Sequence, residues 1–244
     1  EFLLSHPVTE SRISDARSRS RQYPRKMYAD NLDYQLMRAR VELSFIENSK
    51  DAVKRFRAKT LTNSNSPDAD QYGLALALTA NGQFDEAQQL LTLLRNPSPN
   101  KICYITAQSE LDIAQGNNSG AISLLNDALS IGPGNHPLTM AMVEALLAAN
   151  QPHRAEQLLQ EHVKRKPNDP SVWYLLAETH GLAGNIIGVH KARAEYFLLI
   201  GVLDIASRQL SYALPLVRND HLETIRIQER IAQINRMKVE MANL

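Results

Sequence analysis

The feature that most constrains the fold of this chain is a 34-residue repeat between positions 68 and 201. Four sequence columns keep this spacing without an insertion or deletion, and they hold a turn residue, a small residue, a leucine and a proline. They are Gly82, Gly116, Asn150 and Gly184; Ala87, Ala121, Ala155 and Val189; Leu91, Leu125 and Leu159; and Pro99, Pro133 and Pro167. Because independent columns agree, the sequence predicts a stack of copies of one structural unit.

Each column has a physical role in a pair of antiparallel helices. Glycine, with asparagine as second choice, tolerates the left-handed conformation that reverses the chain after a first helix. Alanine lets two helices cross closely, leucine supplies an apolar contact from the second helix, and proline ends that helix. A helical pair repeated every 34 residues is typical of tetratricopeptide (TPR) repeats. The predicted fold is therefore all-α, a TPR superhelical solenoid with a concave face, because a single pair cannot bury enough apolar surface alone.

The phase of the repeat predicts how the chain is divided. The TPR domain is expected to span residues 27–244, and residues 1–26 differ from it, with an arginine-rich helix at about 10–22. Repeats are expected at about 33–66, 68–101, 102–135, 136–169, 170–201 and 187–218. Helices at 171–183, 186–200 and 203–216 follow from this phase, and the middle one serves two repeats.

A capping helix at 220–242 is expected to close the last hydrophobic edge of the solenoid. Asp220 and Glu223 resemble a capping box at its start. Four residues are predicted to form its apolar stripe: Ile227, Ile231, Ile234 and Met241.

Composition narrows the classes of partner. The formal net charge is +1, which argues against a polyanion such as nucleic acid as the partner of the whole chain. The longest apolar run, residues 196–203, is too short to cross a bilayer, so we expect contact with a membrane to be peripheral at most. Cys103 is the only cysteine, which rules out an internal disulfide.

No set of residues in the sequence predicts catalysis. No two of the seven histidines lie three or four residues apart on one helix, and neither an H-E-x-x-H motif nor a glycine-rich phosphate loop is present. His136, His153 and His162 are expected at the surface or between helices, and Cys103 is expected to be a small apolar residue. We therefore expect no catalytic residue, metal ligand or cofactor in this chain.

The predicted binding surface is the inner face of the row of first helices. Glu110, Glu144 and Glu178 repeat at 34 residues and should form an acidic ladder there. Five residues are expected around the ladder: Tyr72, Leu76, Thr106, Met140 and Tyr174. Such a surface suits an extended segment with basic or hydrogen-bond-donating character. In the alternative interpretation the glutamates are solvated, or are neutralised by Lys and Arg of adjacent helices.

Two parts of the chain resemble one family, the β-barrel assembly-enhancing proteases of the Gram-negative periplasm. The first resembles the segment that closes an H-E-x-x-H zinc metallopeptidase domain and comprises Leu4, Ser5, His6, Pro7, Thr9, Arg12 and Ile13. The second resembles the late shared helix and the C-terminal helix of that family and comprises residues 192–196, Gly201, Ala206, Gln209, Leu210, Gln228, Arg230 and Ile231.

The resemblance implies a function that the spacing alone does not. Residues 1–26 would be the end of a missing metallopeptidase domain and a linker, and the zinc site would lie in that missing N-terminal domain. The chain would be the non-catalytic part of a periplasmic protease and chaperone for outer-membrane β-barrel proteins. Its partners would be the β-barrel assembly machinery, outer-membrane protein clients and its own peptidase domain.

Two questions stay open at this point. His6 either lies near the zinc of the full protein and influences access to it, or only shapes a turn with Pro7. The chain as a whole is either this interaction module or a free-standing TPR scaffold or adaptor with unrelated partners.

Overall fold

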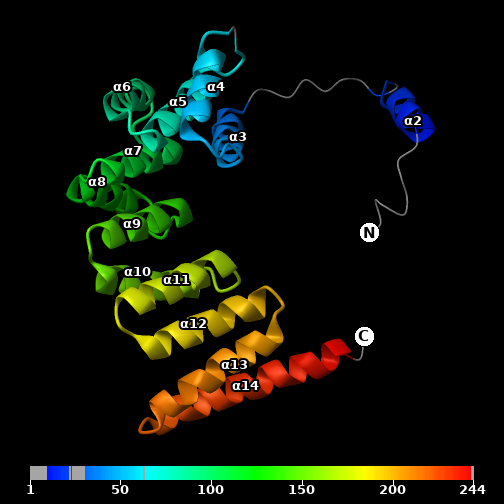
Figure 1. Cartoon of the computed structure of the whole chain (residues 1–244), viewed down its shortest axis with the longest axis vertical. Helices are drawn as coiled ribbons and strands as arrows, with labels where there is room; N and C mark the ends of the chain where they lie inside the picture. The colour runs from blue at the N-terminus through cyan, green and yellow to red at the C-terminus, as the bar shows by residue number, and fades with distance from the viewer. Residues whose placement is uncertain (1–9, 22, 24–30, 63, 243–244) are drawn as a thin grey trace.

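The computed structural model describes residues 10–21, 23, 31–62 and 64–242, and every regular element among them is a helix (Figure 1). The first helices are α2 (Glu10–Arg21), α3 (Leu32–Ser44), α4 (Ser49–Thr60), α5 (Pro67–Ala80), α6 (Phe84–Arg95), α7 (Ile102–Ala114) and α8 (Asn118–Ile131). The remainder are α9 (His136–Ala148), α10 (Pro152–Arg165), α11 (Pro170–Leu182), α12 (Ile186–Leu199), α13 (Leu203–Ala213), the 3-10 helix η1 (Leu214–Val217) and α14 (His221–Ala242). The predicted all-α class is confirmed.

The turn column has the backbone conformation that the sequence predicts. Gly82, Gly116 and Gly184 have φ values of 76°, 81° and 76°, and Asn150 is the only non-glycine residue of the described chain with positive φ, at 55°. The residue after each of them donates its N–H to the carbonyl five positions earlier, as Gln83 does to Leu78 at 2.9 Å. This is the Schellman arrangement, which satisfies the last carbonyls of a helix.

The crossing and leucine columns form the core between helices. Ala87, Ala121 and Ala155 are fully buried, as are the three leucines four residues after them. Val189, the last member of the crossing column, is only half-buried. The larger side chain therefore stands where the packing is looser, at the second helix of the last clear repeat.

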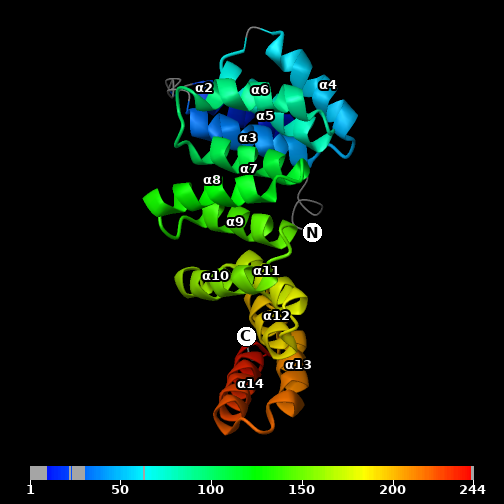
Figure 2. The same cartoon turned by 90° about the vertical axis from the view of Figure 1, so that its left-hand side faces the viewer.

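The first helices of successive repeats pack on one another through the N-terminal part of the array. α3 packs on α5, α5 on α7, and α7 on α9, and α3 also reaches α7. The corresponding contact between α9 and α11 is marginal at best, and α10 joins the two. Figure 2 shows the consequence, since α12–α14 run steeply across the direction of α7–α9.

The helix predicted to serve two repeats does so. α12 packs closely on both α11 and α13, and α11 and α12 lie within one residue of their predicted bounds. α13 is shorter than predicted, because it ends at Ala213 and the chain continues as η1 around Pro215. Proline has no backbone N–H to continue the α-helical hydrogen bonding.

The C-terminal helix α14 corrects two predictions. Asp220 caps it by accepting a hydrogen bond from the Glu223 N–H at 3.0 Å. The Glu223 side chain does not complete the box, because it pairs with Lys191 of α12 and Arg226 instead. Ile227 and Ile234 are buried, but Met241 is exposed. α14 has 22 residues and the underlying α13 has 11, so the end of α14 extends beyond its support.

Candidate functional site

The predicted binding residues form two columns along the first helices of the array. The first column consists of Tyr72, Thr106, Met140 and Tyr174. The second consists of Leu76, Glu110, Glu144 and Glu178. Each of the helices α5, α7, α9 and α11 carries one residue of each column, four positions apart. Residues four apart lie on the same face of a helix. Figure 1 shows these first helices on the hollow side of the curved stack, with α6, α8 and α10 on the other side.

Burial along the two columns changes from one end to the other. Tyr72 is 0% exposed and Leu76 is also buried, so the prediction that they face a partner is wrong. Both lie on α5, which is packed between α3 and α7. Thr106, Glu110 and Met140 are half-buried, and the remaining three residues are exposed: Glu144, Tyr174 and Glu178.

The first glutamate of the ladder is neutralised by an arginine. Arg40 of α3 donates to the Glu110 carboxylate at 2.7 Å and to the Tyr72 hydroxyl at 2.8 and 3.1 Å. Burial alone would lower the pKa of Arg40, but Glu110 and Tyr72 outweigh burial and raise it. Burial also raises the pKa of Tyr72, so its hydroxyl stays protonated. At Glu110 the alternative interpretation, neutralisation by an adjacent helix, is confirmed.

Arg40 was missed by the reasoning from sequence, although a signal for it exists. It lies four residues after buried Leu36 and three before Leu43, which packs against the same core. This spacing puts an arginine on the apolar stripe of α3. A charged residue at such a position needs a partner on the helix that covers it.

Glu144 is left without a counter-ion. No ion pair joins it to any residue that the structure describes. Solvent reaches the carboxylate, yet the surrounding helices partly desolvate it, and this desolvation together with nearby Glu110 raises its pKa. Arg40 acts in the opposite direction without cancelling the shift. A crowded, unpaired carboxylate of this kind favours an incoming cation.

The exposed end of the columns is aromatic as well as acidic. Tyr174 is 50% exposed, and the nearby Glu178 carboxylate raises the pKa of its hydroxyl. Its ring meets Tyr196 of α12 edge-on at 5.4 Å between centroids. Tyrosine offers both an apolar face and a polar tip, a combination that is common at protein interfaces.

The other candidate residues do not assemble into a reactive centre. His162 is buried against His136, 2.9 Å from Nε2 to Nδ1, and His153 is exposed, as predicted. Burial raises the pKa of the Cys103 thiol, which disfavours the nucleophilic thiolate. Within the described residues, no three His, Cys, Asp or Glu side chains are grouped to hold a metal ion. His6 lies outside those residues, so its role stays a prediction.

The sequence and the fold of this chain are both similar to those of tetratricopeptide-repeat proteins. Sequence models of the tetratricopeptide repeat match residues 72–136 and residues 112–179. The chain carries tetratricopeptide repeats. A solved structure of Pseudomonas aeruginosa pilF has a TM-score of 0.50 at 14% identity, covering 84% of this chain and 91% of that one, which supports the fold alone.

Curated relatives support the resemblance of this chain to β-barrel assembly-enhancing proteases. The chain is 30% identical to the β-barrel assembly-enhancing protease of Yersinia pestis over 97% of its own length and 49% of the relative's. It is 35% identical to a putative β-barrel assembly-enhancing protease of Vibrio cholerae over 96% of its length and 49% of the relative's. The chain therefore spans about half the length of the curated relatives it matches. None of its described helices is long and apolar enough to cross a bilayer.

Proposed function

We propose that this chain is the protein-interaction module of a periplasmic metalloprotease and chaperone that assists assembly and quality control of outer-membrane β-barrel proteins. The names of the relatives support the process, and their greater length is compatible with a separate peptidase part that holds the zinc. In this proposal the chain itself binds and does not catalyse.

The observation that carries the binding role is the exposed end of the two columns. Glu144 has no counter-ion among the described residues, and Glu178 and Tyr174 are exposed one helix further on. An extended segment with a basic side chain would pair with Glu144 and stack an apolar or donor group on Tyr174. The partners in this proposal are components of the assembly machinery and β-barrel clients.

In this proposal the partner segment binds in the α9–α12 part of the hollow rather than along its whole length. At the α5 end, Tyr72 and Leu76 are core residues, and Glu110 already forms an ion pair with Arg40. A bound segment would meet a closed surface there. The region in which a segment can reach both carboxylates and aromatic rings extends from Met140 to Tyr196.

Photo-crosslinking in the full-length protein tests this proposal. A photoreactive residue at Tyr174 or at Met140 should crosslink to an assembly-machinery component or to a β-barrel client in cells. The matched control is Leu93, an exposed residue of α6, and α6 lies on the outer side of the stack (Figure 1). Equal crosslinking yields from Leu93 and Tyr174 would contradict the proposal. Crosslinks to unrelated proteins alone would also contradict it, and would favour the alternative of a free-standing adaptor.

A further inference from the structure

A small pocket opens between the last helices, apart from the two columns. Its apolar lining comes from Trp173 of α11, Leu210 of α13 and Ile227 of α14. Five charged residues complete the lining: Lys191, Glu195, Glu223, Arg226 and Arg230. Its volume is about 260 Å³. Pockets for small molecules typically measure about 300–1,000 Å³, so this one suits a single large side chain better than a cofactor.

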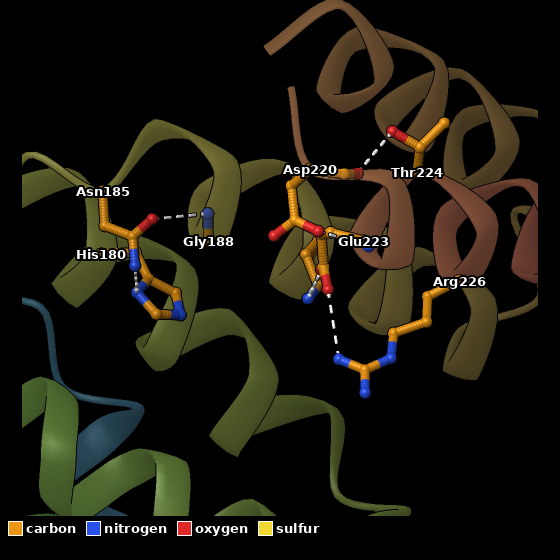
Figure 3. A network of polar contacts seen from close by, with 8 residues as sticks. His180, Asn185, Gly188, Asp220, Glu223, Thr224 and Arg226 are labelled. Atoms are coloured by element: carbon orange, nitrogen blue, oxygen red, sulfur yellow. Dashed lines mark hydrogen bonds and ion pairs between the residues drawn. The ribbon is translucent and has the colours of Figure 1, made fainter. Parts of the chain in front are cut away.

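The charged residues are layered, with the cations outermost. Lys191 and Arg226 both pair with Glu223; their side chains are 45% and 74% exposed, whereas that of Glu223 is 16% exposed. Figure 3 shows Arg226 reaching back to Glu223 at the start of α14. Arg230 pairs with Glu195, whose side chain is 22% exposed. A partner approaching the mouth would therefore meet ammonium and guanidinium groups before carboxylates.

One of these cations, Arg226, keeps the capacity to bind a second carboxylate. Arg226 meets Glu223 only through one nitrogen, at 3.5 Å, and a guanidinium has five N–H donors. Planar guanidinium groups bind carboxylates in a bidentate manner, and Arg236 adds another positive charge further along α14. The rim thus complements an acidic ligand, and the floor complements an apolar one.

We propose that this pocket is a docking site for an acidic protein segment. The segment inserts one large apolar side chain against Trp173 and places flanking carboxylates beside Lys191 and Arg226, the two most exposed cations of the lining. This site differs in charge from the acidic and aromatic part of the hollow, so one chain offers two surfaces that select opposite kinds of segment. The proposal stands independently of the function proposed above.

Trp173 provides a direct readout because it is the only tryptophan in the chain. The probe is a tryptophan-free nonapeptide with one central phenylalanine flanked by aspartates on both sides. Titrating it into the whole chain should change the Trp173 emission in a saturable way. The same peptide with alanine in place of phenylalanine should produce no such change, and added salt should weaken the binding.

Charge reversal at the rim tests the electrostatic half of the proposal. Arg226→Glu should weaken binding of the peptide about tenfold or more, because an attractive contact becomes repulsive. Arg208→Glu, an exposed position on α13 outside the pocket lining, makes the same charge change and should alter the affinity by less than about twofold. Unchanged circular dichroism of both variants establishes that they are folded.

Three results would overturn the proposal. The first is an emission change that does not saturate, or that the alanine peptide produces equally. The second is equal affinity of the Arg226→Glu variant and the parent chain for the peptide. The third is an equal emission change with vesicles of anionic phospholipid, which would assign the basic rim to a membrane surface.

Discussion

The two ends of the hollow are built from the same sequence columns, yet they have different surfaces. At the α5 end, Tyr72 and Leu76 are part of the core. At the α11 end, Tyr174 and Glu178 occupy the equivalent positions, 102 residues further along, and both are exposed. A position in the repeat therefore fixes the direction of a side chain, and the neighbouring helices decide whether it is buried.

The helix that makes the difference is α3. It packs on α5, reaches α7 and sends Arg40 to Tyr72 and Glu110, which closes the hollow at this end. Among the helices that the structure describes, none takes the equivalent place over α11, because the packing between α9 and α11 is marginal at best. The more tightly packed end is the one from which a partner is excluded.

The largest effect is expected from truncating the two tyrosines of one column. Tyr72→Ala should lower the free energy of unfolding by about 3–5 kcal/mol, the range for deleting a buried aromatic side chain. Tyr174→Ala should cost about 1 kcal/mol or less, because half of its side chain is already in solvent. Urea unfolding followed by circular dichroism gives both values.

Tyr72→Phe separates the ring from the hydroxyl in this comparison. The ring keeps its packing, and Arg40 loses the oxygen that accepts two of its hydrogen bonds while keeping Glu110. An intermediate loss of about 1–3 kcal/mol is expected for a donor left without its partner. If Tyr72→Ala and Tyr174→Ala cost the same, the contrast between the two ends is wrong.

A smaller effect is expected from the crossing column. Ala121→Leu should overfill a fully buried crossing and cost about 1–3 kcal/mol. Val189→Leu, at the same column but half-buried, should cost about 1 kcal/mol or less. Gln115→Leu serves as the exposed control and should change the stability by about 0.5 kcal/mol or less. Equal thermal midpoints for the Ala121 and Gln115 variants would contradict the repeat phase.

These contrasts separate what local chemistry determines from what tertiary packing determines. The turns at Gly82 and Asn150 could be predicted because a left-handed backbone depends on the residue itself. The burial of Tyr72 could not be predicted from the sequence, because it depends on α3, a helix that precedes the strict repeat. The partner of Glu223 is similarly remote, since Lys191 lies 32 positions earlier. Sequence spacing does not fix such contacts.

The smallest effect concerns pH and again contrasts the two ends. All histidines of the described chain lie from His136 onward, and two of them, His162 of α10 and His180 of α11, are buried. Burial lowers the pKa of both; the positive charges of Arg165 and Lys166 add to this at His162. Glu156 opposes the shift at His180 without reversing it.

The sign of this effect follows from which state binds more protons. A histidine with a lowered pKa in the folded chain takes up a proton more readily when unfolded, so stability falls as pH drops below the ordinary value of about 6.5. Glu144 acts oppositely, because its raised pKa favours the protonated folded state. At the other end, lysine and arginine outweigh burial and lower the pKa of Glu42, so the stability that it contributes is lost only below 4.5.

Between pH 7 and pH 5, unfolding should therefore begin at the C-terminal end of the array. The urea midpoint reported by Trp173 emission should fall more than the midpoint reported by circular dichroism, which averages over all helices. The double variant His162→Gln, His180→Gln should lose most of this pH dependence, whatever its stability at pH 7. His153→Gln, at an exposed histidine, should keep it. If the double variant keeps the full pH dependence, the two buried histidines are not its source, and the difference between the ends lies in packing alone.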